Sequence, residues 1–311
     1  MLPRLQVDAV VACFLLKYFG EERFPGISDA QYLFFVDIPR GKSVVELERE
    51  GHILLDMGGG KFDHHVTRES GKEKCLSQMV AEYLGVEKNR ALRKLLEYAR
   101  RDDLEGKGTL SKDPIDRAFG LSGLVNDLNR MLPDDQEAVL LTVMPLLMAQ
   151  YGEEKKRAED LPAEYEQKVR EGKARIGSMQ SVRGSIRVAL VETDEIGMAG
   201  YLRGQQGVDM VVQKMSSGHV NIITHQKKEF DLSEIVKQLR KAEIRAKGTG
   251  CAVSEREFAN PGRIIGVEEW YFDTKAKTIQ NGGIRPQGTI PTKLSPEAII
   301  AIIKEAVVIK L

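Results

Sequence analysis

Residues 52–65 contain the side chains of this chain that could best bind a metal ion. The segment reads His-Ile-Leu-Leu-Asp-Met-Gly-Gly-Gly-Lys-Phe-Asp-His-His. Its two carboxylates, Asp56 and Asp63, precede two of the protein's five histidines. These are His64 and His65. Carboxylate oxygens and imidazole nitrogens together suit a divalent ion such as Mn²⁺. The segment therefore predicts a metal site to which other parts of the chain contribute ligands.

Three aspartates elsewhere in the chain are candidates for those ligands. Asp8 stands at the start of an apolar helix, and Asp102 and Asp103 stand at the end of another. An aspartate is also an ordinary capping residue at a helix start, so Asp8 has two interpretations. Carboxylates are disfavoured at a helix C-terminus. The Asp-Asp pair therefore has three interpretations: it binds a cation, closes a turn onto Lys107, or lies on the surface. We expect Asp8, Asp102 and Asp103 all to be metal ligands.

The tripeptide Asp63-His64-His65 follows an apolar strand, with Asp56 seven positions upstream of its first residue. This arrangement resembles the DHH phosphoesterase superfamily, which includes RecJ-type exonucleases, oligoribonucleases and family II inorganic pyrophosphatases. The glycine turn before the tripeptide looks most like the Myg1-type branch. The part of the chain after residue 184 looks like a diverged DHHA1-like substrate domain. The resemblance implies a metal-dependent phosphoesterase that acts on a nucleotide or short oligonucleotide.

The resemblance also implies roles for the residues of the motif. Asp56 would bridge two Mn²⁺ or Mg²⁺ ions, and His64 would be a metal ligand. His65 would contact the substrate phosphate or orient the site. Asp63 would be a structural carboxylate that orients a ligand histidine, and we place it with His65 in the catalytic set. Two such ions would activate a water molecule and stabilise charge on the phosphoryl oxygens.

The first motif of the family is only partly present. The family carries a histidine and two aspartates there, whereas this chain reads Leu5-Gln6-Val7-Asp8 and has no histidine before His52. Either one metal has been lost, or the start of the polypeptide is truncated or altered. Asp102 or Asp103 would match the aspartate of the fourth motif. The alternative function is therefore a catalytically impaired relative that keeps the fold, and one ion at most, as a binding or regulatory module.

The order of predicted elements indicates an α/β protein. Helices are expected at 10–19, 43–50, 75–84 and 91–100, and strands at 31–36 and 53–55. This alternation favours a mostly parallel sheet with helices on both faces. Sites in such sheets lie beyond the carboxyl ends of the strands, and Asp56 stands at such an end. Residues 114–150 have a helical pattern, in which the Met and Leu residues are expected to be core.

We expect three parts along the chain. They are a DHH-like domain at 1–150, a charged helical linker at 151–183, and a smaller α/β domain at 184–311. The last part is predicted to contain strands at 185–191, 209–214 and 219–224, helices at 197–203 and 232–246, a hairpin formed by 263–272 and 276–280, and a final helix capped by Ser295.

Two basic residues near the end of the chain are candidates for binding the substrate phosphate. Arg285 follows the turn that begins at Asn281, and Lys293 precedes the final helix. Cations beside a helix N-terminus can form an anion pocket. The alternative is a β-turn with a solvated arginine.

The composition limits the environment and the partners. The 46 basic and 46 acidic residues give a formal net charge of zero, so there is no global signal for nucleic acid or membrane binding. No apolar run approaches the roughly 18 residues of a membrane span. The three scattered cysteines fit a reducing cytoplasm. We expect a phosphate-containing small molecule or a short nucleic acid as partner and no membrane; homodimerisation is left open.

Overall fold

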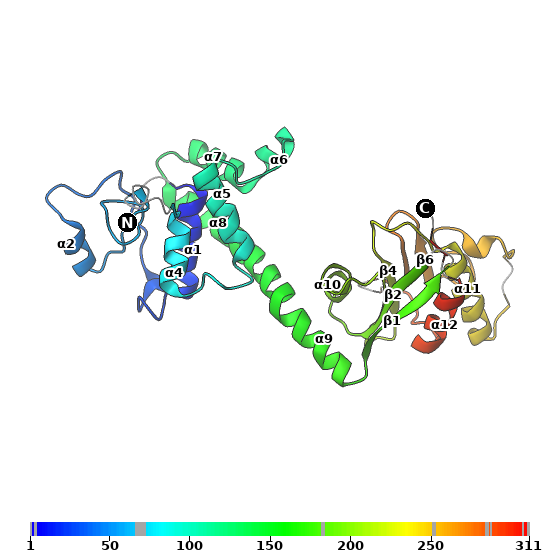
Figure 1. Ribbon diagram of the computed structural model, residues 1–311. Coiled ribbons are helices and arrows are strands. Elements are labelled where there is room, and N and C mark those ends of the chain that lie inside the picture. The colour runs from blue at the N-terminus through cyan, green and yellow to red at the C-terminus, as the bar shows by residue number, and fades with distance from the viewer. Residues whose placement is uncertain are drawn as a thin grey trace. The chain divides into compact units, whose positions relative to one another are not determined.

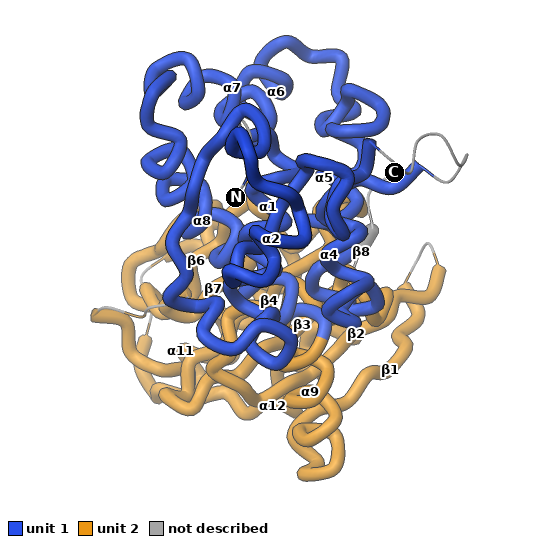
Figure 2. Tube along the Cα trace, turned by 90° about the vertical axis from the view of Figure 1, so that its left-hand side faces the viewer, with its two compact units in different colours: residues 1–158 blue, residues 159–311 orange. Residues whose placement is uncertain are grey.

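The computed structural model describes residues 2, 5–65, 73–181, 184–250, 253–283, 286, 288–306 and 308–309. The chain divides into two compact units, which are Met1–Ala158 and Glu159–Leu311 (Figure 2). The boundary falls inside the segment expected to be a charged linker. Each unit has its own hydrophobic core.

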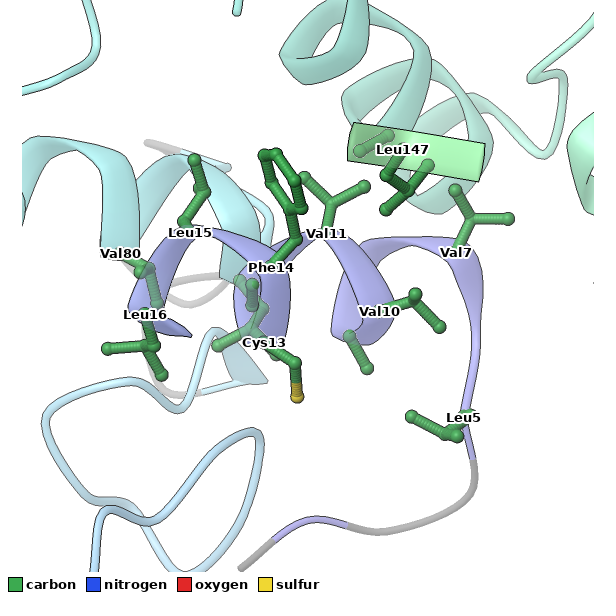
Figure 3. Packing of buried hydrophobic residues seen from close by; sticks show 14 of the residues in the cluster. Leu5, Val7, Val10, Val11, Cys13, Phe14, Leu15, Leu16, Val80 and Leu147 are labelled. Carbon is green, nitrogen blue, oxygen red and sulfur yellow. The ribbon is translucent and has the colours of Figure 1, made fainter. Parts of the chain in front are cut away.

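Unit 1 is built around one helix that is buried on all sides. This helix, α1 (Val7–Phe19), has every residue from Val7 to Leu16 buried. An apolar sequence with no polar stripe is typical of such a helix. Figure 3 shows Phe14 among its packed neighbours, with Val80 and Leu147 contributed by other helices. The other α-helices that the structure describes in unit 1 are α2 (Val44–Arg49), α4 (Leu76–Leu84), α5 (Arg93–Glu105), α6 (Pro114–Ala118), α7 (Leu121–Met131) and α8 (Gln136–Lys155) (Figure 1).

Helix α8 confirms only in part the core expected around Val139–Leu147, because Met144 is buried whereas Leu141 and Leu146 are exposed. Its buried side chains include Val139, Val143, Met144 and Leu147. Methionine here fills the core, which suits its flexible side chain. Among the described helices, none is both long and apolar enough to cross a membrane.

The parallel sheet expected in the N-terminal part is not confirmed. In the described part of unit 1, residues 31–36 contribute only an isolated parallel bridge between Phe34 and Leu2. The Leu2 backbone makes both hydrogen bonds of that bridge, to Leu33 and Phe35, each at 3.0 Å. Helix α1 begins at Val7, and a helical backbone cannot continue a ladder. The strand prediction for 31–36 was therefore wrong.

The strand expected at 53–55 is also replaced by a single bridge. Leu55 pairs with Phe62 across the intervening glycine turn. The bridge is parallel, and the six residues between Leu55 and Phe62 are too few for the crossover that a longer parallel ladder needs. Asp56 therefore stands at the start of a tight loop and not at the carboxyl end of a sheet strand.

Unit 2 contains a mixed six-stranded sheet in the order β1-β2-β3-β4-β7-β6. Strands β2 and β3 are parallel, and the other neighbours are antiparallel. The parallel pair is joined through helix α10 (Met198–Gln205), as a crossover connection requires. The strands are β1 (Ala174–Ser181), β2 (Gly184–Glu192), β3 (Met210–Lys214), β4 (Val220–Thr224), β6 (Trp270–Asp273) and β7 (Thr278–Asn281). A separate pair joins β5 (Phe230–Asp231) to β8 (Val308–Ile309).

Helices pack on both faces of the six-stranded sheet. One face packs against α11 (Ser233–Lys247) and α12 (Pro296–Ala306) in the larger core of this unit. The opposite face, through Ala189 and Val211, packs against α10 and the start of α9 (Leu161–Arg170). Alternate residues of each strand face opposite sides, which explains the nearly continuous burial of β2 and β3.

Most elements predicted for residues 184–311 are confirmed, whereas strands β1, β5 and β8 of unit 2 were not predicted. The hairpin is present, although its first strand begins only at Trp270. The Ser295 hydroxyl accepts from Ala298 N–H at 3.2 Å, as a capping residue should. Residues 174–181, expected in the helical linker, instead form β1 at the edge of the sheet. Its register against β2 runs from Ala174 to Ser181, so tertiary pairing outweighed the charged local sequence.

Unit 2 also contains a fully buried arginine. The guanidinium of Arg240, on α11, donates to four backbone oxygens: Phe258 at 2.9 Å, Asn260 at 2.8 Å, Gly262 at 2.5 Å and Trp270 at 2.8 Å. Burial lowers the pKa of Arg240 to about 10. These bonds hold the segment between α11 and β6 against α11.

We predict that Arg240→Met destabilises unit 2 by at least about 3 kcal/mol, because four carbonyl oxygens lose their donor. Lys241→Met is the matched control on the same helix, since Lys241 makes only a partly exposed ion pair with Glu255. It should cost no more than about 0.5 kcal/mol. Urea unfolding followed by fluorescence of Trp270, the single tryptophan, reports on this unit. Equal midpoints for the two variants would contradict the prediction.

Candidate metal centre

The loop from Asp56 to His65 depends on its glycines. Gly58 and Gly59 have φ values of +70° and +71°, which favour glycine. A Cβ on Gly58 would also lie 2.1 Å from the Cδ1 atom of Ile38. The loop closes where Asp56 N–H donates to the Phe62 carbonyl at 2.9 Å. The glycine turn therefore brings the two ends of the predicted motif together.

Asp56 itself has a positive φ of 57°. Aspartate tolerates this left-handed region better than most residues, but at a cost. Strained residues of this kind concentrate where a side chain must point in one direction. Here the conformation places the carboxylate beside His64.

Asp63 is structural. It is buried, and its Oδ2 accepts from Gly59 N–H at 2.7 Å while Oδ1 accepts from His65 N–H at 3.0 Å. Both bonds stay within the loop and fix its shape. This agrees with the orienting role expected for Asp63 and does not support its place in the catalytic set, because both oxygens are engaged by the loop backbone.

His64 lies between two carboxylates. It is buried, with Nδ1 2.7 Å from Asp56 Oδ1 and Nε2 3.8 Å from Asp103 Oδ2. Each ring nitrogen of His64 therefore faces a carboxylate oxygen. The structure thus brings together residues of the loop and of α5, as the sequence predicted.

His65 is the exposed member of the group. Its side chain is 58% accessible, and Nε2 lies 3.6 Å from Asp56 Oδ1. Its ring centroid lies 4.3 Å from that of His64. An accessible imidazole beside a buried one can reach a ligand in solution while the buried one stays fixed.

Asp8 connects α1 to α4. It lies within the first turn of α1, is buried, and accepts from Leu76 N–H at 2.7 Å and Ser77 N–H at 3.0 Å. It therefore caps α4 and not its own helix, and the N-terminus of α4 favours its negative charge. Burial raises the pKa of the Asp8 carboxyl; the Ser77 hydrogen bonds oppose this effect, and the nearby charge of Asp103 adds to it.

Only one of the two adjacent aspartates of α5 faces the histidines. Asp103 lies near His64, whereas Asp102 Oδ1 accepts from the Ser122 hydroxyl at 2.5 Å. Neighbouring residues of a helix point about 100° apart. The sequence predicted a helix that ends at residue 100, before both aspartates. Helix α5 instead continues to Glu105, so both lie within its last turn.

Five side chains form what we call the Asp–His cluster: Asp8, Asp56, His64, His65 and Asp103. They include two groups of three whose ligand atoms lie within 4.8 Å of one another, and His64 belongs to both groups. Three carboxylates with two imidazoles carry an excess of negative charge in a largely buried space. Such a donor set fits a divalent cation that accepts both oxygen and nitrogen ligands.

The residues expected to bind the substrate phosphate are not part of this cluster. Lys293 belongs to unit 2, where its side chain is exposed and its N–H donates to Glu243 at 2.8 Å. Arg285 lies outside the described residues.

Sequence reasoning missed the partners that hold Asp8 and Asp102. Cys75, the residue before α4, is not one of the preferred helix-capping residues. A helix start without a good capping residue in the sequence was the available signal that a distant carboxylate caps it. No comparable signal marks Ser122 as the partner of Asp102.

We predict that Asp103→Asn weakens Mn²⁺ binding about tenfold or more, because it removes a charge from the Asp–His cluster. Asp102→Asn should leave binding unchanged, because an amide oxygen can still accept from Ser122. The two variants have the same change in charge one residue apart. Mn²⁺ titration followed by electron paramagnetic resonance measures both affinities, and equal losses would contradict the assignment.

Comparisons with known proteins add little to this geometry. No protein-family model matches the chain, and no curated protein matches it. A crystal structure of an uncharacterized protein from Helicobacter pylori G27 is 12% identical, with 77% of this chain and 88% of that chain covered and a TM-score of 0.23. A similarity at this TM-score indicates neither fold nor function.

Proposed function

We propose that this protein is a phosphoesterase dependent on a divalent cation, of the kind found in the DHH superfamily. The observation that carries the proposal is the convergence of Asp8, Asp56 and Asp103 on His64. These residues come from α1, the glycine loop and α5, which are far apart in sequence. On this proposal unit 1 corresponds to the DHH-like domain and unit 2 to the DHHA1-like substrate domain.

The Asp–His cluster would hold the cation. Its mixed oxygen and nitrogen donors favour Mn²⁺ over Mg²⁺, which prefers oxygen ligands alone. A bound cation of this kind polarises a phosphoryl oxygen and makes a water molecule more acidic.

The histidines of the cluster have different tasks in this proposal. Asp56 Oδ1 and His64 Nδ1, which lie 2.7 Å apart, would bind the cation together. His65 is accessible and can donate a hydrogen bond to a phosphoryl oxygen of the substrate. Asp63 keeps His65 in place through its backbone N–H. The substrate class, a nucleotide or short oligonucleotide phosphate ester, rests on the family resemblance, as do the phosphate-binding roles of Arg285 and Lys293.

A cytoplasmic location is part of the proposal. Cys13 and Cys75 are buried as free thiols, and burial raises the pKa of each to about 12. Unpaired thiols fit a reducing compartment.

A second candidate function is a binding module with one cation and no hydrolysis. Both oxygens of Asp8 already accept backbone hydrogen bonds from α4. The chain also has no histidine before His52 to complete a second metal site. These two observations favour a single ion over a pair.

The test combines Mn²⁺ binding with hydrolysis of bis(p-nitrophenyl) phosphate. The native chain should bind Mn²⁺ stoichiometrically and hydrolyse the diester. His64→Gln should abolish both, because the cluster loses the side chain shared by its two groups. His52→Gln is the matched control. His52 lies in the same unit but outside the cluster, and its ring lies 4.0 Å from the Glu50 carboxylate.

The outcomes separate the two candidates. Stoichiometric Mn²⁺ without hydrolysis supports the binding module and overturns the enzyme. No Mn²⁺ binding by a folded native chain, shown by circular dichroism, overturns both. Full activity in His64→Gln would show that the reaction does not depend on the cluster.

A further inference from the structure

A second polar site lies in unit 1 beside the end of α5. A pocket of about 670 Å³ is enclosed by the last turn of α5, the loop at 106–112 and the first turn of α7. Asp102 lines this pocket, and the next residue, Asp103, belongs to the Asp–His cluster. The pocket and the cluster therefore adjoin the same turn of one helix.

The pocket carries three positive charges without matching negative ones. Lys107, Lys112 and Arg117 line it, and within the described ranges their side chains make no hydrogen bond or ion pair. Asp102 is the one carboxylate in the lining, and it is bonded to Ser122. Cations gathered at one concave surface raise the local concentration of anions.

The loop at 106–112 also offers backbone N–H groups to a ligand. The N–H groups of residues 108–112 donate to no acceptor in the part of the chain that the structure describes. Helix α7 begins at Leu121, and the residue before it, Gly120, has no side chain to cap this end; in the first turn the Tyr98 hydroxyl accepts from Ser122 N–H. Free N–H groups and a helix N-terminus both favour an anionic ligand.

One tyrosine orders the wall of the pocket. The Tyr98 hydroxyl lies 3.0 Å from the Ser122 hydroxyl and 3.4 Å from that of Thr109, and it accepts from Ser122 N–H at 3.1 Å. A Cβ on Gly108 would lie 2.6 Å from Ser122 Oγ and 2.7 Å from Tyr98 Cζ. Only glycine lets the loop pass this close, so the pocket has a defined wall.

We propose that this basic pocket, formed around Lys107, Lys112 and Arg117, binds a phosphoryl group of a ligand that carries at least two phosphates. This inference rests on the proposed function, because it assigns the other phosphate to the Asp–His cluster next to it. The geometry selects inorganic pyrophosphate-like or oligonucleotide-like anions over single-phosphate esters. It places the phosphate contact in unit 1, independently of Arg285 and Lys293.

The test measures anion binding by metal-depleted protein, so that it does not depend on the cation. Isothermal titration calorimetry with inorganic pyrophosphate, a 5′-phosphorylated dinucleotide, inorganic phosphate and sulfate compares the native chain with Lys107→Gln/Arg117→Gln. The double variant should bind the first two ligands at least about tenfold more weakly, because two charge-assisted contacts are removed. The slope of log affinity against log salt for the dinucleotide should also fall, by about 0.7 for each cation removed.

The control is Lys88→Gln/Arg90→Gln, which makes the same change in net charge at two exposed residues between α4 and α5. It should bind like the native chain. If the native chain binds pyrophosphate more tightly than the dinucleotide, an inorganic ligand is supported. If it binds the dinucleotide more tightly than pyrophosphate, a nucleic-acid ligand is supported. Equal binding of sulfate and pyrophosphate, an equal loss in both double variants, or no binding at millimolar ligand overturns the proposal.

Mn²⁺ binding distinguishes this failure from failure of the proposed function. Lys107→Gln/Arg117→Gln should bind Mn²⁺ as the native chain does, because neither side chain belongs to the Asp–His cluster. Normal Mn²⁺ binding without pyrophosphate binding overturns the basic pocket alone. Pyrophosphate binding by a chain that takes up no Mn²⁺ keeps the pocket as an anion site and overturns its link to a phosphoesterase.

Discussion

Three carboxylates around one buried imidazole are the constraint on which unit 1 depends. Asp8 and Asp103 are close enough for the charge of one to raise the pKa of the other, and Asp56 adds a third acidic group beside His64. Burying charge without compensation is expensive. The protein meets part of this cost with the N-terminus of α4, which donates two N–H groups to Asp8. The remaining negative charge would favour the binding of a divalent cation.

The same constraint ties the site to the core. Asp8 is part of α1, the helix around which unit 1 is packed, so movement of this carboxylate would disturb the core. The glycine loop approaches from the other side and is fixed by Asp63. A site held by a buried helix and an internally bonded loop keeps its geometry better than one on free loops. Asp102 and Ser122 line the basic pocket, and the next residue of α5, Asp103, belongs to the Asp–His cluster.

The sequence was a better guide to unit 2 than to unit 1. Strands β2, β3 and β4 and helix α11 lie close to their predicted positions, because each has a clear apolar period and polar turns at both ends. In unit 1 the predicted helices were found, and Ser43 caps α2 in a capping box with Glu46. The strands at 31–36 and 53–55 were not, because an apolar segment becomes a strand only if a partner pairs with it over several residues. Strand β1 shows the converse, since pairing with β2 makes a strand from a sequence that looked like a linker.

The residue types and spacing from Asp56 to His65 were enough to identify the loop that carries the Asp–His cluster, because a turn of three glycines brings near neighbours in sequence together. The residue types and spacing could not show which of Asp102 and Asp103 lies beside His64. Two adjacent positions on a helix differ only in the residues that pack against them. That choice depended on Ser122, which is 20 residues away, and on His64. The partners of Asp8 likewise lie 68 and 69 residues along the chain. Contacts of this range arise from the packing of helices, which is why only the tertiary structure determined them.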